Sequence, residues 1–188
     1  MKVVGFNGSP RKEGNTVRLI QEVFHELQKE GIETELVQLS EREIRGCLAC
    51  YRCIERKNRR CAIETDAGNR YIEKMLGADG ILFGSPVYLT DVTSELKALI
   101  DRAGYVSRAN DRMFRNKVGG AVVAVRRVGA FRTLDTMIHF FLNNLMIVPG
   151  YAHAIGKEPG DVEKDEEGMQ LVRLLGQRMA WLLTKLHP

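Results

Sequence analysis

Short apolar runs alternate along the chain with segments in which apolar residues recur every three or four positions. The apolar runs are typical of buried strands, and we expect five of them, at 3–6, 34–39, 80–84, 117–125 and 146–148. The periodic segments predict five helices, at 16–30, 66–76, 93–103, 131–145 and 169–186. Residues 40–65 are expected to be irregular, and Pro149-Gly150 to end the fifth strand. The acidic segment 159–168 predicts a loop whose carboxylates help to begin the last helix.

Strands that are apolar throughout and alternate with helices indicate a parallel sheet covered on both faces. We therefore expect the α/β class, as a three-layer sandwich with a five-stranded parallel sheet and helices on both faces. Right-handed crossovers leave few strand orders, and 2-1-3-4-5 is the common one at this size. The 188 residues contain no linker or internal repeat. We expect one domain over 1–188, with a cysteine-rich loop at about 44–65.

The composition is that of an ordinary folded protein, with 44% hydrophobic and 28% charged residues. It excludes a disordered chain, a collagen-like repeat and a small disulfide-rich scaffold. The net charge of +4 is too small to indicate nucleic acid or a membrane surface as a partner. No apolar run approaches the roughly 20 residues of a membrane span, and the N-terminus lacks the features of a signal peptide. We therefore expect a cytoplasmic protein whose cysteines stay reduced.

In a sheet of this order, ligands bind beyond the carboxyl ends of the strands, where strands 1 and 3 are neighbours. The loop 8–16 runs from the first strand into a helix N-terminus, whose free N–H groups favour an anion. The guanidinium of Arg11 can donate paired hydrogen bonds to phosphate oxygens, and neutral donors come from Ser9, Asn15 and Thr16. The loop has neither a Walker ending nor the dinucleotide pattern G-x-G-x-x-G. The alternative is a capped turn that binds nothing.

Two further loops are expected at the same edge of the sheet. Loop 85–90 contains Pro86, which restricts the backbone, and Tyr88, which offers a flat amphipathic ring. Loop 126–130 contains Arg126 and Arg127, whose adjacent side chains need not both face one ligand. An ordinary connection and solvated arginines are the alternatives for these two loops.

All the cysteines follow the pattern C-x2-C-x2-C-x7-C, as Cys47, Cys50, Cys53 and Cys61. Three thiolates at this spacing can bind successive irons of one cluster. The fourth is more distant than in the bacterial ferredoxin run and no proline follows it, so one self-contained [4Fe–4S] site is the favoured interpretation. Zinc and free or redox-active thiols remain as alternatives.

The cysteine loop is strongly basic. This charge indicates a solvated face, a docking surface for an acidic carrier such as a ferredoxin, or a contact with the 2′-phosphate of NADPH. Nucleic acid is disfavoured because no aromatic residues are interleaved. The basic residues are Arg45, Arg52, Arg56, Lys57, Arg59 and Arg60.

Several of these motifs together resemble one family. The motifs are Gly8-Ser9-Pro10-Arg11, Gly14-Asn15-Thr16, Gly84-Ser85-Pro86-Val87-Tyr88, Leu96-Lys97 and Asp101-Arg102. In order and spacing they resemble the flavodoxin-like NAD(P)H-dependent FMN reductases over nearly the whole chain. The cysteine run resembles the iron–sulfur flavoprotein branch of that family.

The resemblance implies FMN as cofactor, a possible [4Fe–4S] cluster, and NAD(P)H as co-substrate. It implies that the FMN phosphate is held by the 8–16 loop, through Ser9, Arg11, Gly14, Asn15 and Thr16. It implies that the isoalloxazine ring lies against Pro86, Val87 and Tyr88. Loop 126–130 would contribute Gly129 to the flavin site. Arg126 or Arg127 would place a positive charge near the ring, or would contact a phosphate or NADPH.

The function that the resemblance implies is an FMN-dependent oxidoreductase. Electrons would pass from a reduced nicotinamide or ferredoxin through FMN to a quinone, oxygen or protein acceptor. No catalytic acid or base is required, and none is assigned. Such flavoproteins are usually homodimers or homotetramers, and the apolar helix 131–145 is a candidate interface. The alternatives are a non-enzymatic electron carrier, a redox- or metal-sensing module, and a phosphate-ligand enzyme without flavin.

Overall fold

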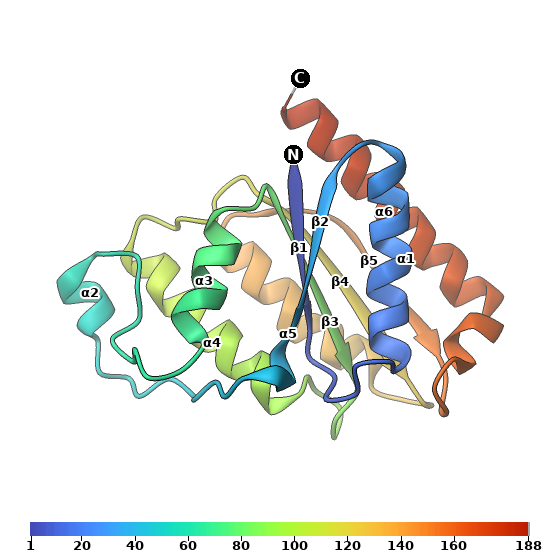
Figure 1. Cartoon of the computed structure of the whole chain (residues 1–188), viewed down its shortest axis with the longest axis horizontal. Helices are drawn as coiled ribbons and strands as arrows, with labels where there is room; N and C mark the ends of the chain where they lie inside the picture. Colours follow the sequence, from blue (N-terminus) through green and yellow to red (C-terminus); the bar gives the residue numbers. More distant parts are fainter. Residues whose placement is uncertain (188) are drawn as a thin grey trace.

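The computed structural model describes residues 1–187 and is built on one five-stranded sheet (Figure 1). The strand order is β2-β1-β3-β4-β5, and each neighbouring pair is parallel, so both predictions are confirmed. The strands are β1 (Lys2–Asn7), β2 (Glu33–Gln38), β3 (Gly80–Pro86), β4 (Val118–Val125) and β5 (Ile147–Ile155).

Helices cover both faces of the sheet, which confirms the three-layer sandwich (Figure 1). The helices α1 (Asn15–Lys29) and α6 (Glu166–Leu186) pack together on one face. The other face is covered by α3 (Gly68–Leu76), α4 (Ser94–Ala109) and α5 (Ala130–Asn143). A short helix α2 (Arg52–Arg56) lies outside this layer, against α4.

The two cores explain why the central strand β4 is buried and apolar along its whole length. On β4, Val123 and Val125 face the α3–α5 layer, whereas Val122 and Ala124 face α1 and α6. Side chains of a strand alternate between the two faces, so a strand covered on both faces has no polar side.

The helix α1 lies close to the centre of the sheet. A Cβ atom at Gly84 would come within 2.6 Å of the Ile20 side chain, so the absence of a side chain on β3 allows this approach. The close contact holds the N-terminal end of α1 at the carboxyl edge of β1 and β3, where the binding loops are expected.

The predicted end of the fifth strand is wrong, because β5 continues through Pro149-Gly150 to Ile155. Val148 and Pro149 together stand opposite Gly119 of β4, where the register shifts. A bulge on an edge strand tolerates proline, since one side of that strand has no partner to bond.

Other predicted boundaries also move. The stretch 40–65 contains α2 and the end of a 3₁₀ turn, η1 (Leu39–Glu41), and α4 continues beyond Ala103 to Ala109. The predicted acidic loop contains η2 (Asp161–Lys164) and the first residues of α6. The predicted role of its carboxylates is confirmed, because Asp165 caps α6 by accepting a hydrogen bond from the Gly168 N–H at 3.0 Å.

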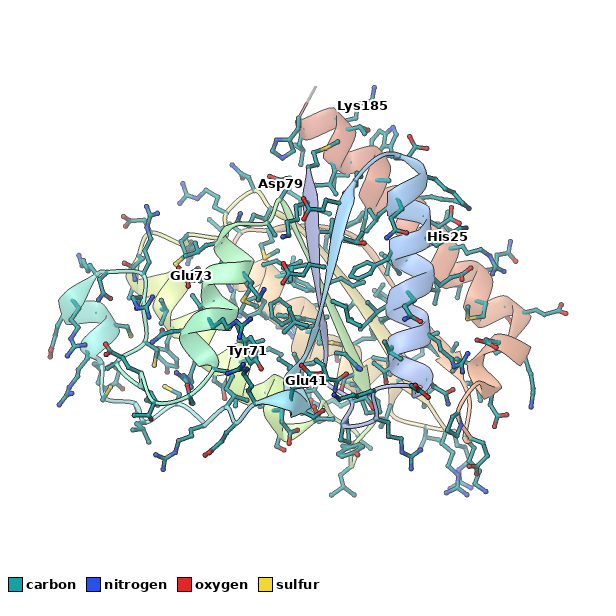
Figure 2. The ribbon with its side chains drawn as sticks, viewed as in Figure 1. His25, Glu41, Tyr71, Glu73, Asp79 and Lys185 are labelled. Carbon is teal, nitrogen blue, oxygen red and sulfur yellow. The ribbon has the colours of Figure 1, made fainter. Side chains whose placement is uncertain are left out.

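The charged groups at the amino edge of the sheet have structural partners. Asp79 accepts a hydrogen bond from the Lys2 N–H at 2.8 Å, and it lies at the upper end of the sheet in Figure 2. Lys117 donates to the carbonyl oxygens of Leu76 and Ala78, and burial lowers its pKa. None of the helices within 1–187 combines the length and apolarity that crossing a membrane requires.

Candidate functional site

The N-terminal end of α1 is free of side-chain caps. Gly14 is its N-cap residue, no side chain caps the helix there, and its first turn contains no acidic residue. The first N–H groups of a helix have no partner within it, and the helix dipole favours negative charge at this end. Ser9 and Thr16 are buried beside this end, whereas Arg11 is exposed. The loop therefore combines the features of an anion site with one exposed cation.

Hydrogen bonds from neighbouring elements hold the 8–16 loop in place. Gln38, at the end of β2, donates to the Ser9 carbonyl oxygen at 2.5 Å, and Ser9 Oγ accepts from the Arg11 N–H at 3.2 Å. Lys12 is paired with Glu41 at 2.8 Å, and Figure 2 shows Glu41 at this lower edge of the sheet. Of the two adjacent cations, only Arg11 is left for a ligand.

Asn15 has partners that the sequence did not predict. Its side-chain nitrogen donates to the Glu158 carbonyl oxygen at 3.0 Å, and its side-chain oxygen accepts from the Gly160 N–H at 2.8 Å. Arg18 and Glu163 form an ion pair between the same two segments. Asn15 therefore joins the β5–α6 connection to the phosphate loop.

The loops after β1 and β3 are joined through Thr93, the N-cap residue of α4. Its hydroxyl donates to the Gly8 carbonyl oxygen at 2.8 Å, and its N–H donates to Ser85 Oγ at 3.2 Å. Gly8 itself donates to the Gly84 carbonyl oxygen at 2.8 Å. The two loops consequently form one continuous surface at the predicted binding edge.

The loop after β4 packs against the loop after β3. Gly129 has φ +96°, and a Cβ atom there would lie 2.9 Å from Val87 and 3.2 Å from the Thr90 backbone. The Val87 N–H donates to the Ala124 carbonyl oxygen at 3.1 Å. Tyr88 is about half exposed at this rim. The structure thus brings all three predicted loops together.

Arg126 and Arg127 lie on this rim with exposed side chains. Neither guanidinium has a hydrogen bond or ion pair to another group within residues 1–187. Both are therefore available to a ligand, and their predicted roles stay predictions.

The four cysteines line one hollow beside α4, together with Arg102 and Tyr105. All are free thiols; Cys47 and Cys50 are exposed, and Cys53 and Cys61 are half-buried. Burial raises the pKa of Cys53, and the neighbouring Cys61 and Cys47 act in the same direction. In the part of the chain described, no three His, Cys, Asp or Glu side chains have the arrangement of a single-ion site.

The cysteine segment is sharply folded. Four residues between Cys47 and Cys61 have left-handed backbone conformations although none is glycine: Ala49, Tyr51, Lys57 and Arg59. Such conformations cost energy and persist where the surrounding structure imposes them. Asn69 of α3 accepts from the Cys61 N–H at 2.7 Å and donates to the Cys61 carbonyl oxygen at 2.9 Å. Side chains of the helical layer therefore fix the end of the segment.

Sequence reasoning assigned no role to the buried pair of Arg102 and Asp66. Their side chains are 0% and 1% exposed, and Arg102 Nη1 lies 2.5 Å from Asp66 Oδ2. Arg102 lies on the apolar face of α4, which also includes Leu99 and Val106. An arginine within an apolar stripe is the signal that could have identified it, since buried charges require partners.

These features can be compared with known proteins. The sequence matches the family described as NADPH-dependent FMN reductase over residues 1–160. The chain belongs to this family. The activity class of this family, and therefore of this chain, is FMN-dependent oxidoreduction.

Its relatives in the NADPH-dependent FMN reductase family include iron–sulfur flavoproteins. One from Methanocaldococcus jannaschii is 42% identical over 190 residues, covering 96% of each chain. One from Methanosarcina thermophila is 33% identical, covering 97% of this chain and 95% of that one. The predicted iron–sulfur flavoprotein branch is confirmed.

A solved structure shows the same fold in another flavin-binding protein. RosB with bound 8-demethyl-8-formylriboflavin-5'-phosphate has a TM-score of 0.78 and 22% identity, covering 99% of this chain and 80% of that one. The likeness, together with the 2-1-3-4-5 strand order, establishes the flavodoxin-like fold of this FMN reductase family member.

Proposed function

We propose that the chain binds FMN at the carboxyl edge of β1, β3 and β4 and transfers electrons through it. The observation that carries the proposal is the joining of the three loops at the switch point between β1 and β3. Thr93 bonds the first loop to the second, and Gly129 packs the third against the second. Sheets with this strand order bind their ligands at that point, as flavodoxins bind FMN.

The phosphate would be held by the 8–16 loop. The uncapped end of α1 supplies N–H groups, Ser9 and Thr16 supply hydroxyls, and Arg11 supplies the charge. Gly14, at the N-cap, lets the backbone lie against the phosphate. Asn15, whose amide already bonds the 158–160 segment, would hold the loop rather than act as its main phosphate donor.

The flavin ring would lie against Pro86, Val87 and Tyr88. Bound FMN supplies the hydride and single-electron chemistry. The chain's own residues orient the ring, and Arg126 or Arg127 would place a positive charge beside it. The backbone at Leu89 and Thr90, both left-handed, turns the loop back through the paired residues Tyr88 and Asp91.

We further propose that the four cysteines hold a [4Fe–4S] cluster. The chemistry of the donor set fits, because four free thiols line one hollow and each can bind a separate iron. The irons of a cluster lie apart, so its ligands need not have the arrangement of a single-ion site. Helix α4 begins at the flavin edge with Ser94 and reaches the cysteine hollow at Arg102, about 12 Å along its axis at roughly 1.5 Å per residue.

Electrons would enter from a reduced nicotinamide or a ferredoxin and leave to a quinone, oxygen or a protein acceptor. The basic cysteine segment fits an acidic carrier or the 2′-phosphate of NADPH. Family membership supports the nicotinamide.

The test is an absorption spectrum of protein purified without oxygen, with FMN, iron and acid-labile sulfide assayed on the same sample. We expect one FMN and about four irons per chain, since a [4Fe–4S] site binds four. Cys50→Ser should lose the iron and keep the flavin. Flavin without iron would contradict the cluster, and a chain that cannot be reconstituted with FMN would contradict the proposal as a whole.

The same sample then identifies the electron donor. NADPH, NADH and reduced ferredoxin are mixed with it separately, and reduction of the flavin absorbance is followed over time. Reduction by a nicotinamide with turnover on quinones supports the reductase. Rapid exchange with ferredoxin and no nicotinamide turnover would instead show an electron carrier.

A further inference from the structure

Arg102 is buried beside the cysteine hollow and bonded to both ends of the cysteine segment. Its Nη1 donates to the Arg45 carbonyl oxygen at 3.2 Å and to Asp66, and its Nη2 donates to the Ile63 carbonyl oxygen at 3.1 Å. Arg45 precedes the first cysteine, and Ile63 follows the last. One guanidinium therefore clamps the two ends of the segment that carries all four thiols.

The clamp is itself held tightly. Asp66 also accepts hydrogen bonds from the N–H groups of Arg45 and Gly68, both at 2.9 Å. The guanidinium packs directly against Gly68, where any Cβ atom would collide with it. Its position is therefore fixed by Asp66 and by the start of α3, next to the end of the cysteine segment.

One nitrogen of this guanidinium makes no hydrogen bond. Arg102 Nε is buried and has no hydrogen-bond partner among the described residues. A buried donor left without an acceptor loses the hydrogen bond that it would make with water. Arg102 lines the same hollow as the four cysteines, so an acceptor bound there would lie beside this guanidinium. Asp66 neutralises the charge of Arg102. What the guanidinium offers to a group in the hollow is therefore mainly a hydrogen bond.

We propose that Arg102 is a positioning residue of the cysteine site, which clamps both ends of the segment and keeps its Nε–H for a sulfur atom bound in the hollow. The inference rests on the proposed cluster. Hydrogen bonds to the sulfurs are among the factors that set a cluster's potential, because they stabilise the more negative, reduced state. Loss of this donor should therefore shift the midpoint potential of the cluster to more negative values.

The experiment compares Arg102→Lys with Asn69→Ala in the FMN-loaded full chain, purified without oxygen. Lysine keeps the charge but has no Nε–H at this place. Asn69 also makes three hydrogen bonds to the segment, to Cys61 N–H and to the carbonyl oxygens of Cys61 and Ile63, and all its bonds are within the protein. Iron and sulfide per chain are assayed, and the midpoint potential is measured by a redox titration followed by electron paramagnetic resonance.

We expect Arg102→Lys to shift the potential negatively and Asn69→Ala to leave it unchanged. Loss of iron in Arg102→Lys alone would also support the proposal, since Asn69→Ala removes three hydrogen bonds to the same segment. Equal shifts, loss of iron in both, or an unchanged potential in Arg102→Lys would overturn it. A wild-type chain without iron would show instead that the proposed cluster is wrong, and the inference would fall with it.

Discussion

At the scale of single residues, buried polar side chains decide how the cysteine segment is held. The side chains of Asp66, Asn69 and Arg102 are buried, and each bonds backbone groups of the segment or of its flanks. A buried pair loses most when one partner is removed, because the other charge is left without compensation.

Asp66→Ala is expected to lower the free energy of unfolding by about 3–5 kcal/mol at pH 7. Burial raises the pKa of Asp66, but hydrogen bonds from Arg102 and from the Arg45 and Gly68 N–H groups hold it below the ordinary 3.8. Its stabilisation is therefore complete above pH 3.8 and is lost as the pH falls through the lower, folded value.

Urea unfolding of the wild type and of Asp66→Ala, from neutral pH down through the pKa of Asp66, measures this difference in stability. The difference between wild type and Asp66→Ala should shrink in acid. A difference that stays constant down to the acid limit of folding would contradict the assigned ion pair.

Gly129→Ala tests the contact between two flavin loops. The residue has φ +96° and little space beside Val87, so we expect a loss of about 1–3 kcal/mol of stability and weaker FMN binding. Gly77→Ala is the control, because that glycine has an ordinary helical conformation and only ordinary contacts. Equal effects of the two substitutions, by thermal unfolding and FMN titration, would contradict this role for Gly129.

At the scale of elements, the sequence pattern predicts the start of a helix better than the end of an edge strand. The start of α1 is close to its prediction, because the glycine- and proline-containing turn before it is a local signal. The end of β5 is not, because the bulge at Pro149 depends on β4 lying beside it. Asn15 likewise bonds a segment more than 140 residues away, a contact that spacing does not reveal.

Arg11→Ala is expected to weaken FMN binding by roughly tenfold or more, since a hydrogen bond to a charged group contributes about 1.5–3 kcal/mol. Lys12→Ala is the matched control: it removes the same charge from the same loop, but Lys12 is already paired with Glu41. FMN titration by fluorescence measures both dissociation constants, and a larger loss in Lys12→Ala would contradict the assignment of Arg11.

At the scale of the whole molecule, exposed apolar side chains occur on α5, on β5 and in the turn between them. They include Phe131, which contacts Tyr151 edge-on with ring centroids 6.5 Å apart. Exposed apolar patches of this kind mark interaction surfaces, and β5 is also an edge strand with bonding groups to spare. The exposed residues are Phe131, Leu142, Leu145, Tyr151 and Ile155.

We expect a homodimer or homotetramer that uses this surface. Phe131→Glu should shift the assembly towards the monomer, measured by light scattering over a range of concentrations. Leu36→Glu, on the opposite edge strand β2, changes a comparably exposed apolar residue and should have no effect. A monomeric wild-type chain would contradict the expectation.

The sequence by itself determined the fold class, the strand order and the edge that carries the binding loops. Each depends on local patterns: apolar runs for strands, helical spacing for helices, and the right hand of their connections. The clustering of the cysteines in one segment was equally evident. Only the tertiary structure decided which donors remain for a ligand. The side chains of Lys12 and Asn15 are already bonded to other segments, whereas, among the described residues, that of Arg11 is not. Arg102 bonds the cysteine segment from α4. Hydrogen bonds between distant segments depend on packing, which spacing along the sequence does not reveal.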